Sequence, residues 1–170
     1  TAGRTSLIMD VSPPPTGETQ TNAHASTLAF ELTSGRRPLI VNCGSGVPFG
    51  ADWARAGRAT ASHSVLEIEG YSSSRFGTQR RFGNTKDVLA SVPKDVRMRQ
   101  NADTGGAGLL AGHDGYIATH GLTHARTLDM TFDGRGLVGD DNEIGREITR
   151  LWVPHSEIFL MVAHRQADHF

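Results

Sequence analysis

A two-residue hydrophobic period limits what this chain can fold into more than any other feature of its sequence. Within residues 26–33 the apolar Leu28, Phe30 and Leu32 alternate with polar neighbours such as Glu31. Successive side chains of a strand point to opposite faces, so this alternation predicts a strand with one buried and one solvated face. A glycine count of 20 in 170 residues, above the usual fraction of about 7%, fits the many turns that strands need.

Further strands are predicted at short intervals along the chain. Asp133 and Gly134 give the strongest hairpin signal, because this pair favours the tight turn between antiparallel strands. The other predicted strands have alternating or short apolar runs bounded by turn residues, and they cover residues 38–41, 63–69, 96–99, 116–119, 128–132 and 136–138. Strands in close succession without helices between them predict an all-β fold, an antiparallel β-sandwich of supersandwich type.

The last part of the chain has a different pattern. Ile144, Ile148 and Leu151 fall on one face of a helix, and Pro154 would end it, so we expect a short helix near residues 143–152. We therefore divide the chain into a β-sandwich domain over residues 1–142 and a divergent segment over residues 143–170.

Charge and composition exclude several classes of function. The formal charge is −1, so no global field favours nucleic acid or an anionic membrane. The longest apolar run is far shorter than the roughly 20 residues of a membrane-spanning helix, and the N-terminus has no signal-peptide pattern. A single cysteine, Cys43, excludes an internal disulfide and a multi-cysteine zinc site.

Two histidines near strand ends are candidates for metal ligands. His24 and His63 each precede an alternating segment, and neighbouring strands can bring such residues to one end of a sheet, where imidazoles can share Zn²⁺. Asn42 and Cys43 lie at the end of the strand between them. Only one of these two would point to the same face, and a thiolate is the better zinc ligand. A structural, hydrogen-bonded role for either histidine remains the alternative.

A second group of polar residues lies later in the chain. His113, Tyr116, His120, His124 and Arg126 include the residue types of an acid and base site. On a strand, however, His120 and His124 would be about 13 Å apart, so we favour structural roles for most of them. Paired arginines elsewhere could bind an acidic polymer, but solvated surface positions explain them equally well.

Taken in order, several motifs resemble one known family. The segments are residues 22–32 around His24, residues 38–44, residues 57–66 around His63, and residues 112–126 with the Asp133–Gly134 turn. They are similar to the C-terminal region of heparinase II/III-like polysaccharide lyases over roughly residues 4–142.

The resemblance implies a function for the whole protein. Members of this family join an N-terminal helical toroid to a β-sandwich and cleave uronate-containing polysaccharides, including glycosaminoglycans, by β-elimination in the cleft between the two. We therefore expect an acidic polysaccharide as substrate, a toroid domain of the same full-length chain as partner, and a periplasmic location. The 170 residues alone should have little or no activity, because half of the cleft is missing.

The resemblance also assigns roles to individual residues. It places Asn22 at the catalytic histidine, His24 and His63 at two zinc ligands, and Asn42 at the third ligand, where the family has Asp. Zn²⁺ is thus the implied cofactor, with Cys43 as an alternative to Asn42. Arg126 is a candidate for substrate binding. Because Asn22 cannot act as a base, a non-catalytic carbohydrate-binding or structural module is the alternative function.

Overall fold

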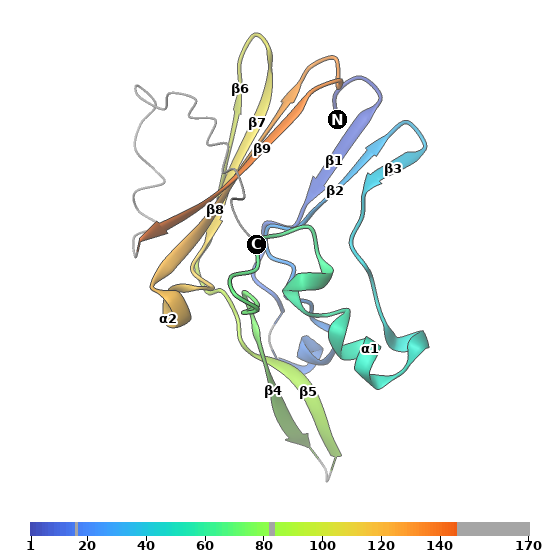
Figure 1. Ribbon diagram of the computed structural model, residues 1–170, viewed down its shortest axis with the longest axis vertical. Coiled ribbons are helices and arrows are strands. Elements are labelled where there is room, and N and C mark those ends of the chain that lie inside the picture. The colour runs from blue at the N-terminus through green and yellow to red at the C-terminus, as the bar shows by residue number, and fades with distance from the viewer. Residues whose placement is uncertain (16, 82–83, 146–170) are drawn as a thin grey trace, which may run out of the picture.

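The computed structural model describes residues 1–15, 17–81 and 84–145. Strands dominate it, and they form three antiparallel sheets (Figure 1). The strands are β1 Thr5–Met9, β2 Phe30–Ser34, β3 Arg37–Ile40, β4 Arg75–Arg81, β5 Asn84–Ser91, β6 Val96–Ala102, β7 Gly106–His113, β8 Leu122–Thr131 and β9 Leu137–Gly145. The α-helices are α1 Ala51–Ala56 and α2 Ile117–His120, and the 3₁₀ helices are η1 Gly17–Asn22, η2 Val47–Phe49 and η3 Thr60–Ser62.

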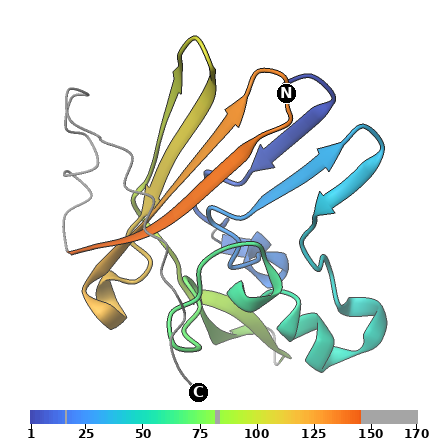
Figure 2. The same cartoon turned by 45° about the horizontal axis from the view of Figure 1, so that its top comes forward.

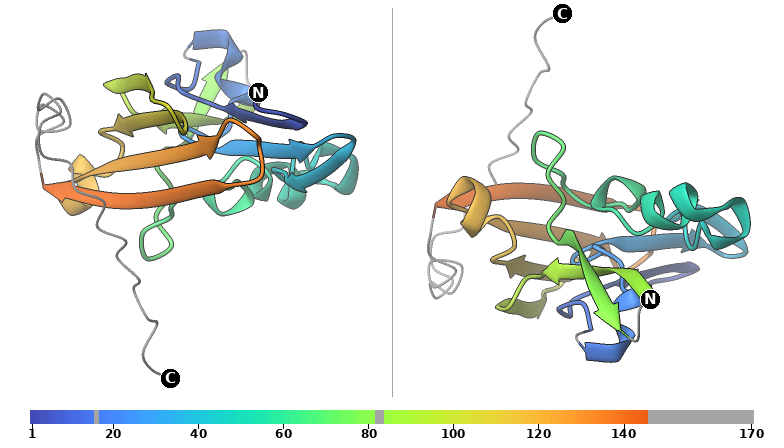
Figure 3. Two further views of the ribbon diagram at one scale, coloured as in Figure 1. Left: turned by 90° about the horizontal axis from the view of Figure 1, so that it is seen from above. Right: turned by 90° about the horizontal axis from the view of Figure 1, so that it is seen from below.

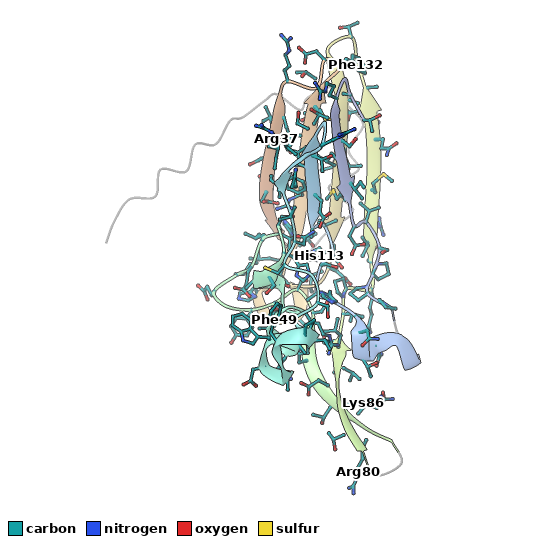
Figure 4. All side chains as sticks on the ribbon, turned by 90° about the vertical axis from the view of Figure 1, so that its right-hand side faces the viewer. Arg37, Phe49, Arg80, Lys86, His113 and Phe132 are labelled. Carbon is teal, nitrogen blue, oxygen red and sulfur yellow. The ribbon has the colours of Figure 1, made fainter. Side chains whose placement is uncertain are left out.

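Two of the sheets form the layers of a sandwich. One has the order β1-β2-β3 and the other β6-β7-β8-β9, while β4 and β5 form a separate hairpin. Figure 1 shows the two layers from the side, and in Figure 4 their strands overlap and run in nearly the same direction. This is the aligned packing of a β-sandwich, so the predicted fold class is confirmed.

The hairpin turns set the register of both sheets. Between β8 and β9 the chain turns at Asp133 and Gly134, and Gly134 has a left-handed φ of +69°. Residues equidistant from this turn face each other, as the pairing of Met130 with Leu137 shows. The turn also joins the layers, because the Thr5 hydroxyl donates to the Gly134 carbonyl at 2.7 Å.

The core lies between the two layers and at their lower end. Leu32 of β2 and Leu128 of β8 are buried on the inner faces, and Leu28 and Tyr116 are fully buried below them. Thr5, at the N-terminal end of β1, contacts the β8–β9 turn, and Figure 2 shows that the β6–β7 hairpin lies farther from β1 than this turn does. An open apolar groove of about 500 Å³ lies between β1 and the four-stranded sheet, and Met9 and Leu109 are among the residues that line it.

The connections below the sandwich carry the polar sites. The segment between β3 and β4 contains η2, α1 and η3, and Figure 3 shows it beside the β4–β5 hairpin. Arg58, directly after α1, is buried and donates to the carbonyls of Ala23, Gln20 and Asp87. Among the described residues no helix is long and apolar enough to cross a membrane.

Three sequence-based predictions of local structure need correction. Residues 63–69 form no strand, apart from an isolated bridge between Ile68 and Tyr71, because their apolar residues pack into the connection instead of a sheet. Residues 116–119 lie in and beside α2, where Gly121 ends the helix with φ +69°. Residues 143–145 belong to β9, and the rest of the helix predicted over 143–152 lies outside the described residues.

Candidate functional site

The structure brings His24 and His63 into direct contact. Nδ1 of His24 lies 3.1 Å from Nε2 of His63, and the ring planes are nearly perpendicular with centroids 5.2 Å apart. Both side chains are half-buried. Neither residue lies in a strand, because His24 precedes β2 in an irregular segment and His63 directly follows η3.

Hydrogen bonds to backbone carbonyls connect the two segments and hold the histidines in place. The N–H of Ala25 donates to the Arg58 carbonyl at 2.8 Å, and the buried Thr60 hydroxyl donates to the Ala25 carbonyl at 2.9 Å. Arg58 Nε donates to the carbonyl of Ala23 at 2.7 Å. His24 therefore lies between two residues whose backbones are fixed to the segment that carries His63.

The neighbouring carbonyl of Ala59 determines which nitrogen of His63 carries the proton. Nδ1 of His63 is 2.7 Å from this carbonyl, and a carbonyl only accepts hydrogen bonds, so Nδ1 is the donor. Nε2 of neutral His63 then has a free lone pair, and Nδ1–H of His24 donates to it.

Both imidazoles favour the neutral form. Burial lowers the pKa of His24, and the charges of His63 and Arg58 lower it further, against a smaller opposite effect of the Gly57 backbone. Burial also lowers the pKa of His63, and the hydrogen bond to Ala59 opposes this. Neutral imidazoles are the forms that accept a proton or bind a metal ion.

The remaining metal candidates do not complete a zinc site. Two nitrogens bound to one tetrahedral zinc lie roughly 3.3 Å apart, so the two histidines fit as a pair. Oδ1 of Asn42, however, accepts the N–H of Ser64 at 2.8 Å, and Cys43 is exposed. Within the described ranges no group of three or more His, Cys, Asp or Glu side chains could hold a metal ion.

Comparison with known proteins identifies the family. The model of the family "Heparinase II/III-like, C-terminal" matches residues 1–162. The chain belongs to this family. FtsZ-localized protein C from Caulobacter vibrioides is 31% identical over 140 residues, which is 82% of this chain and 24% of that protein. The chain thus spans about a quarter of the relative's length, and no solved structure matches it.

Within the heparinase II/III-like domain, the other two candidates have contrasting environments. Asn22 ends η1 and is exposed, so its amide is available to a ligand. Arg126 is only 6% exposed, and its Nε, Nη1 and Nη2 all donate hydrogen bonds within the chain. This geometry gives Arg126 a structural role and does not support substrate binding.

A second histidine pair lies inside the sandwich. Nδ1 of His124 is 3.2 Å from Nε2 of His113, and both residues are almost completely buried. His124 Nε2 is 2.8 Å from Oδ1 of Asp141, which also binds Arg126. Sequence reasoning grouped the histidines with Arg126 but missed Asp141. The signal was present, since the Asp133–Gly134 turn places Asp141 directly opposite Arg126.

Proposed function

We propose that this domain forms one wall of the active site of a polysaccharide lyase that acts on uronate-containing polymers. The observation that supports the proposal best is the His24–His63 contact at 3.1 Å. Two segments distant in the sequence supply these rings, and their lowered pKa values keep them neutral near pH 7. Neutral imidazoles can donate to or accept from the hydroxyl groups of a sugar without adding charge.

The proposed reaction is β-elimination. A base takes the proton at C5 of the uronate, a C4–C5 double bond forms, and the C4–O bond breaks so that its electron pair goes to the leaving oxygen, which takes up a proton. Neutralising the uronate carboxylate makes the C5 proton more acidic. Asn22 cannot act as the base, so the base and acid belong to the rest of the full-length protein, while exposed Asn22 and His24 bind the sugar.

Zn²⁺ is part of this proposal only as a weakly held ion. His24 and His63 would supply two ligands, and the bond from His63 to the Ala59 carbonyl orients that ring as outer partners of metal ligands do. The amide of Asn42 is a poor third ligand. We therefore expect the ion to be removed readily by a chelator, with little effect on the fold.

The test is an assay of the full-length protein on heparan sulfate, alginate and related polymers. Product formation is monitored by the ultraviolet absorbance of the unsaturated uronate. We expect activity in the full-length protein, a loss of it in His24→Ala and His63→Ala, and none in the 170-residue chain. His120→Ala is the matched control, because His120 lies on α2 and contacts Thr119 and Tyr71 instead. Absence of product on every polymer would contradict the proposal.

The second candidate is a non-catalytic carbohydrate-binding or structural module. It is favoured by Asn22 at the position of the family's catalytic histidine. The similar protein from Caulobacter vibrioides is named FtsZ-localized protein C, a name that mentions localisation and no lyase activity. Under this proposal Asn22→His in the full-length protein leaves turnover unchanged, whereas a gain of turnover supports the lyase. A periplasmic location, proposed on the family resemblance alone, can be tested by cell fractionation.

A further inference from the structure

A chain of hydrogen bonds runs through the buried part of the sandwich. The N–H of Gly115 donates to Nδ1 of His113 at 3.0 Å, so Nε2 of neutral His113 carries the proton and donates it to His124 Nδ1. His124 Nε2–H then donates to Asp141 Oδ1 at 2.8 Å. Each hydrogen bond therefore fixes the donor and the acceptor of the next one along the chain. In this arrangement both histidines are neutral, and Asp141 accepts the last hydrogen bond.

Asp141 and Arg126 form a bidentate ion pair at the end of this chain. Nε of Arg126 donates to Oδ1 and Nη2 to Oδ2, both at 2.7 Å. Burial acts to raise the pKa of Asp141, but the hydrogen bonds from His124 and Arg126 and the charge of Arg126 outweigh it and hold the pKa well below its ordinary value. Asp141 is therefore an anion that orients the guanidinium of Arg126.

Nη1 of Arg126, the nitrogen outside the ion pair, donates hydrogen bonds to the two segments that carry the candidate site. Nη1 donates to the carbonyl of Leu28 at 2.7 Å and to that of Ser64 at 2.5 Å. Ser64 directly follows His63, and Leu28 lies four residues after His24 at an unusual φ of +69°. A single guanidinium thus joins both histidine segments to strand β8.

We infer that Arg126 and Asp141 are positioning residues for the His24–His63 pair, an inference that rests on the proposed function of that pair. His113 and His124 support Asp141, Asp141 fixes the guanidinium, and the guanidinium fixes the backbone beside both imidazoles. Only a planar fork with several donors reaches Asp141 and two carbonyls at once. Lysine at position 126 would keep the charge but lose most of these contacts.

The test uses NMR of the ring nitrogens in the full chain at one pH. In the wild type, long-range ¹H–¹⁵N correlations should show the proton of His63 on Nδ1, with a shifted Nε2 resonance from the contact with His24. Asp141→Asn and Arg126→Lys should shift the ring nitrogens of His24 and His63 and lose the Nδ1–H signature of His63. This readout does not depend on lyase activity, so it stays valid even if no polymer is cleaved.

Two control variants separate positioning from general weakening of the fold. Asp140→Asn removes the neighbouring carboxylate, which accepts a hydrogen bond from Asn142 instead, and should leave the ring signals unchanged. Leu89→Ala weakens the core without removing a group of the network, because Leu89 is a fully buried apolar residue of β5. The inference is overturned if Leu89→Ala shifts the ring resonances of His24 and His63 as much as Asp141→Asn does. It is also overturned if Asp141→Asn and Arg126→Lys leave these resonances unchanged, or if both of these variants unfold the chain.

Discussion

Buried His113 should make the domain unstable in mild acid. Burial lowers its pKa from 6.5 to about 3, and the electrostatic interactions with His124 and Arg126 act in the same direction. The folded protein therefore keeps His113 neutral while the unfolded chain binds a proton below pH 6.5. Stability from this residue is fully present above pH 6.5 and is lost as the pH falls towards 3.

The size of the effect follows from the displacement of the pKa. Each pH unit between the two pKa values changes the free energy of unfolding by about 1.4 kcal/mol for one group. Between pH 8 and pH 5 His113 should thus remove about 2 kcal/mol of stability. Asp141 adds nothing to this interval, because its depressed pKa matters only near and below the ordinary carboxyl pKa of 3.8.

Urea unfolding of the wild type and His113→Gln over pH 5 to 8 tests this reasoning. We expect the variant to be less stable than the wild type at pH 8. Because Gln has no proton to gain in this range, the slope of its unfolding free energy against pH should be smaller by about 1.4 kcal/mol per pH unit below pH 6. The remaining slope reports His24 and His63, whose pKa values are also lowered. Parallel profiles for the two proteins would refute the assignment of the proton uptake to His113.

Three further predictions test other parts of the structure. Arg58→Met should lower the free energy of unfolding by about 3 kcal/mol in urea titrations, because three carbonyls, that of buried Ala23 among them, lose their donor; a loss below about 1 kcal/mol would contradict this. Asn42→Asp should raise the affinity for Zn²⁺ at least about tenfold in calorimetric titrations, since an anionic oxygen is the better ligand, and an unchanged affinity would remove residue 42 from the proposed ligands. Gly134→Ala should destabilise far more than Gly121→Ala in thermal melts, although both have φ +69°, because only at Gly134 would a Cβ atom lie 2.1 Å from the Ala2 carbonyl oxygen; equal effects would contradict the packing at the β8–β9 turn.

The sequence predicted the hairpins well because their signals are local. Ser34 to Arg37 and Asp133–Gly134 contain the turn residues that hairpins require, and the structure has strands on both sides of each. The β4–β5 hairpin was missed, because β4 and the first half of β5 are mostly polar and show no regular alternation of apolar residues. Residues 116–119 were predicted as extended because one helical turn is too short to show a 3.6-residue period.

The candidate site was only partly predictable for a similar reason. The ordered motifs point to His24 and His63, and the structure places them 3.1 Å apart. The prediction derived their proximity from strand ends, whereas turns and a 3₁₀ helix bring them together. Such irregular segments follow tertiary hydrogen bonds, including those of Arg58 and Thr60, and these bonds leave no periodic trace in the sequence.

Arg126 shows how two rules of sequence interpretation conflict. Its charge suggested an acidic ligand, but it has the same strand parity as Leu128, which predicts an inward side chain. The structure follows parity, and Arg126 is buried. A buried guanidinium needs a partner, and the turn at Asp133–Gly134 supplies Asp141 directly across β9. An inward-facing charge opposite an acid at the mirrored hairpin position therefore predicts an internal ion pair better than a binding residue.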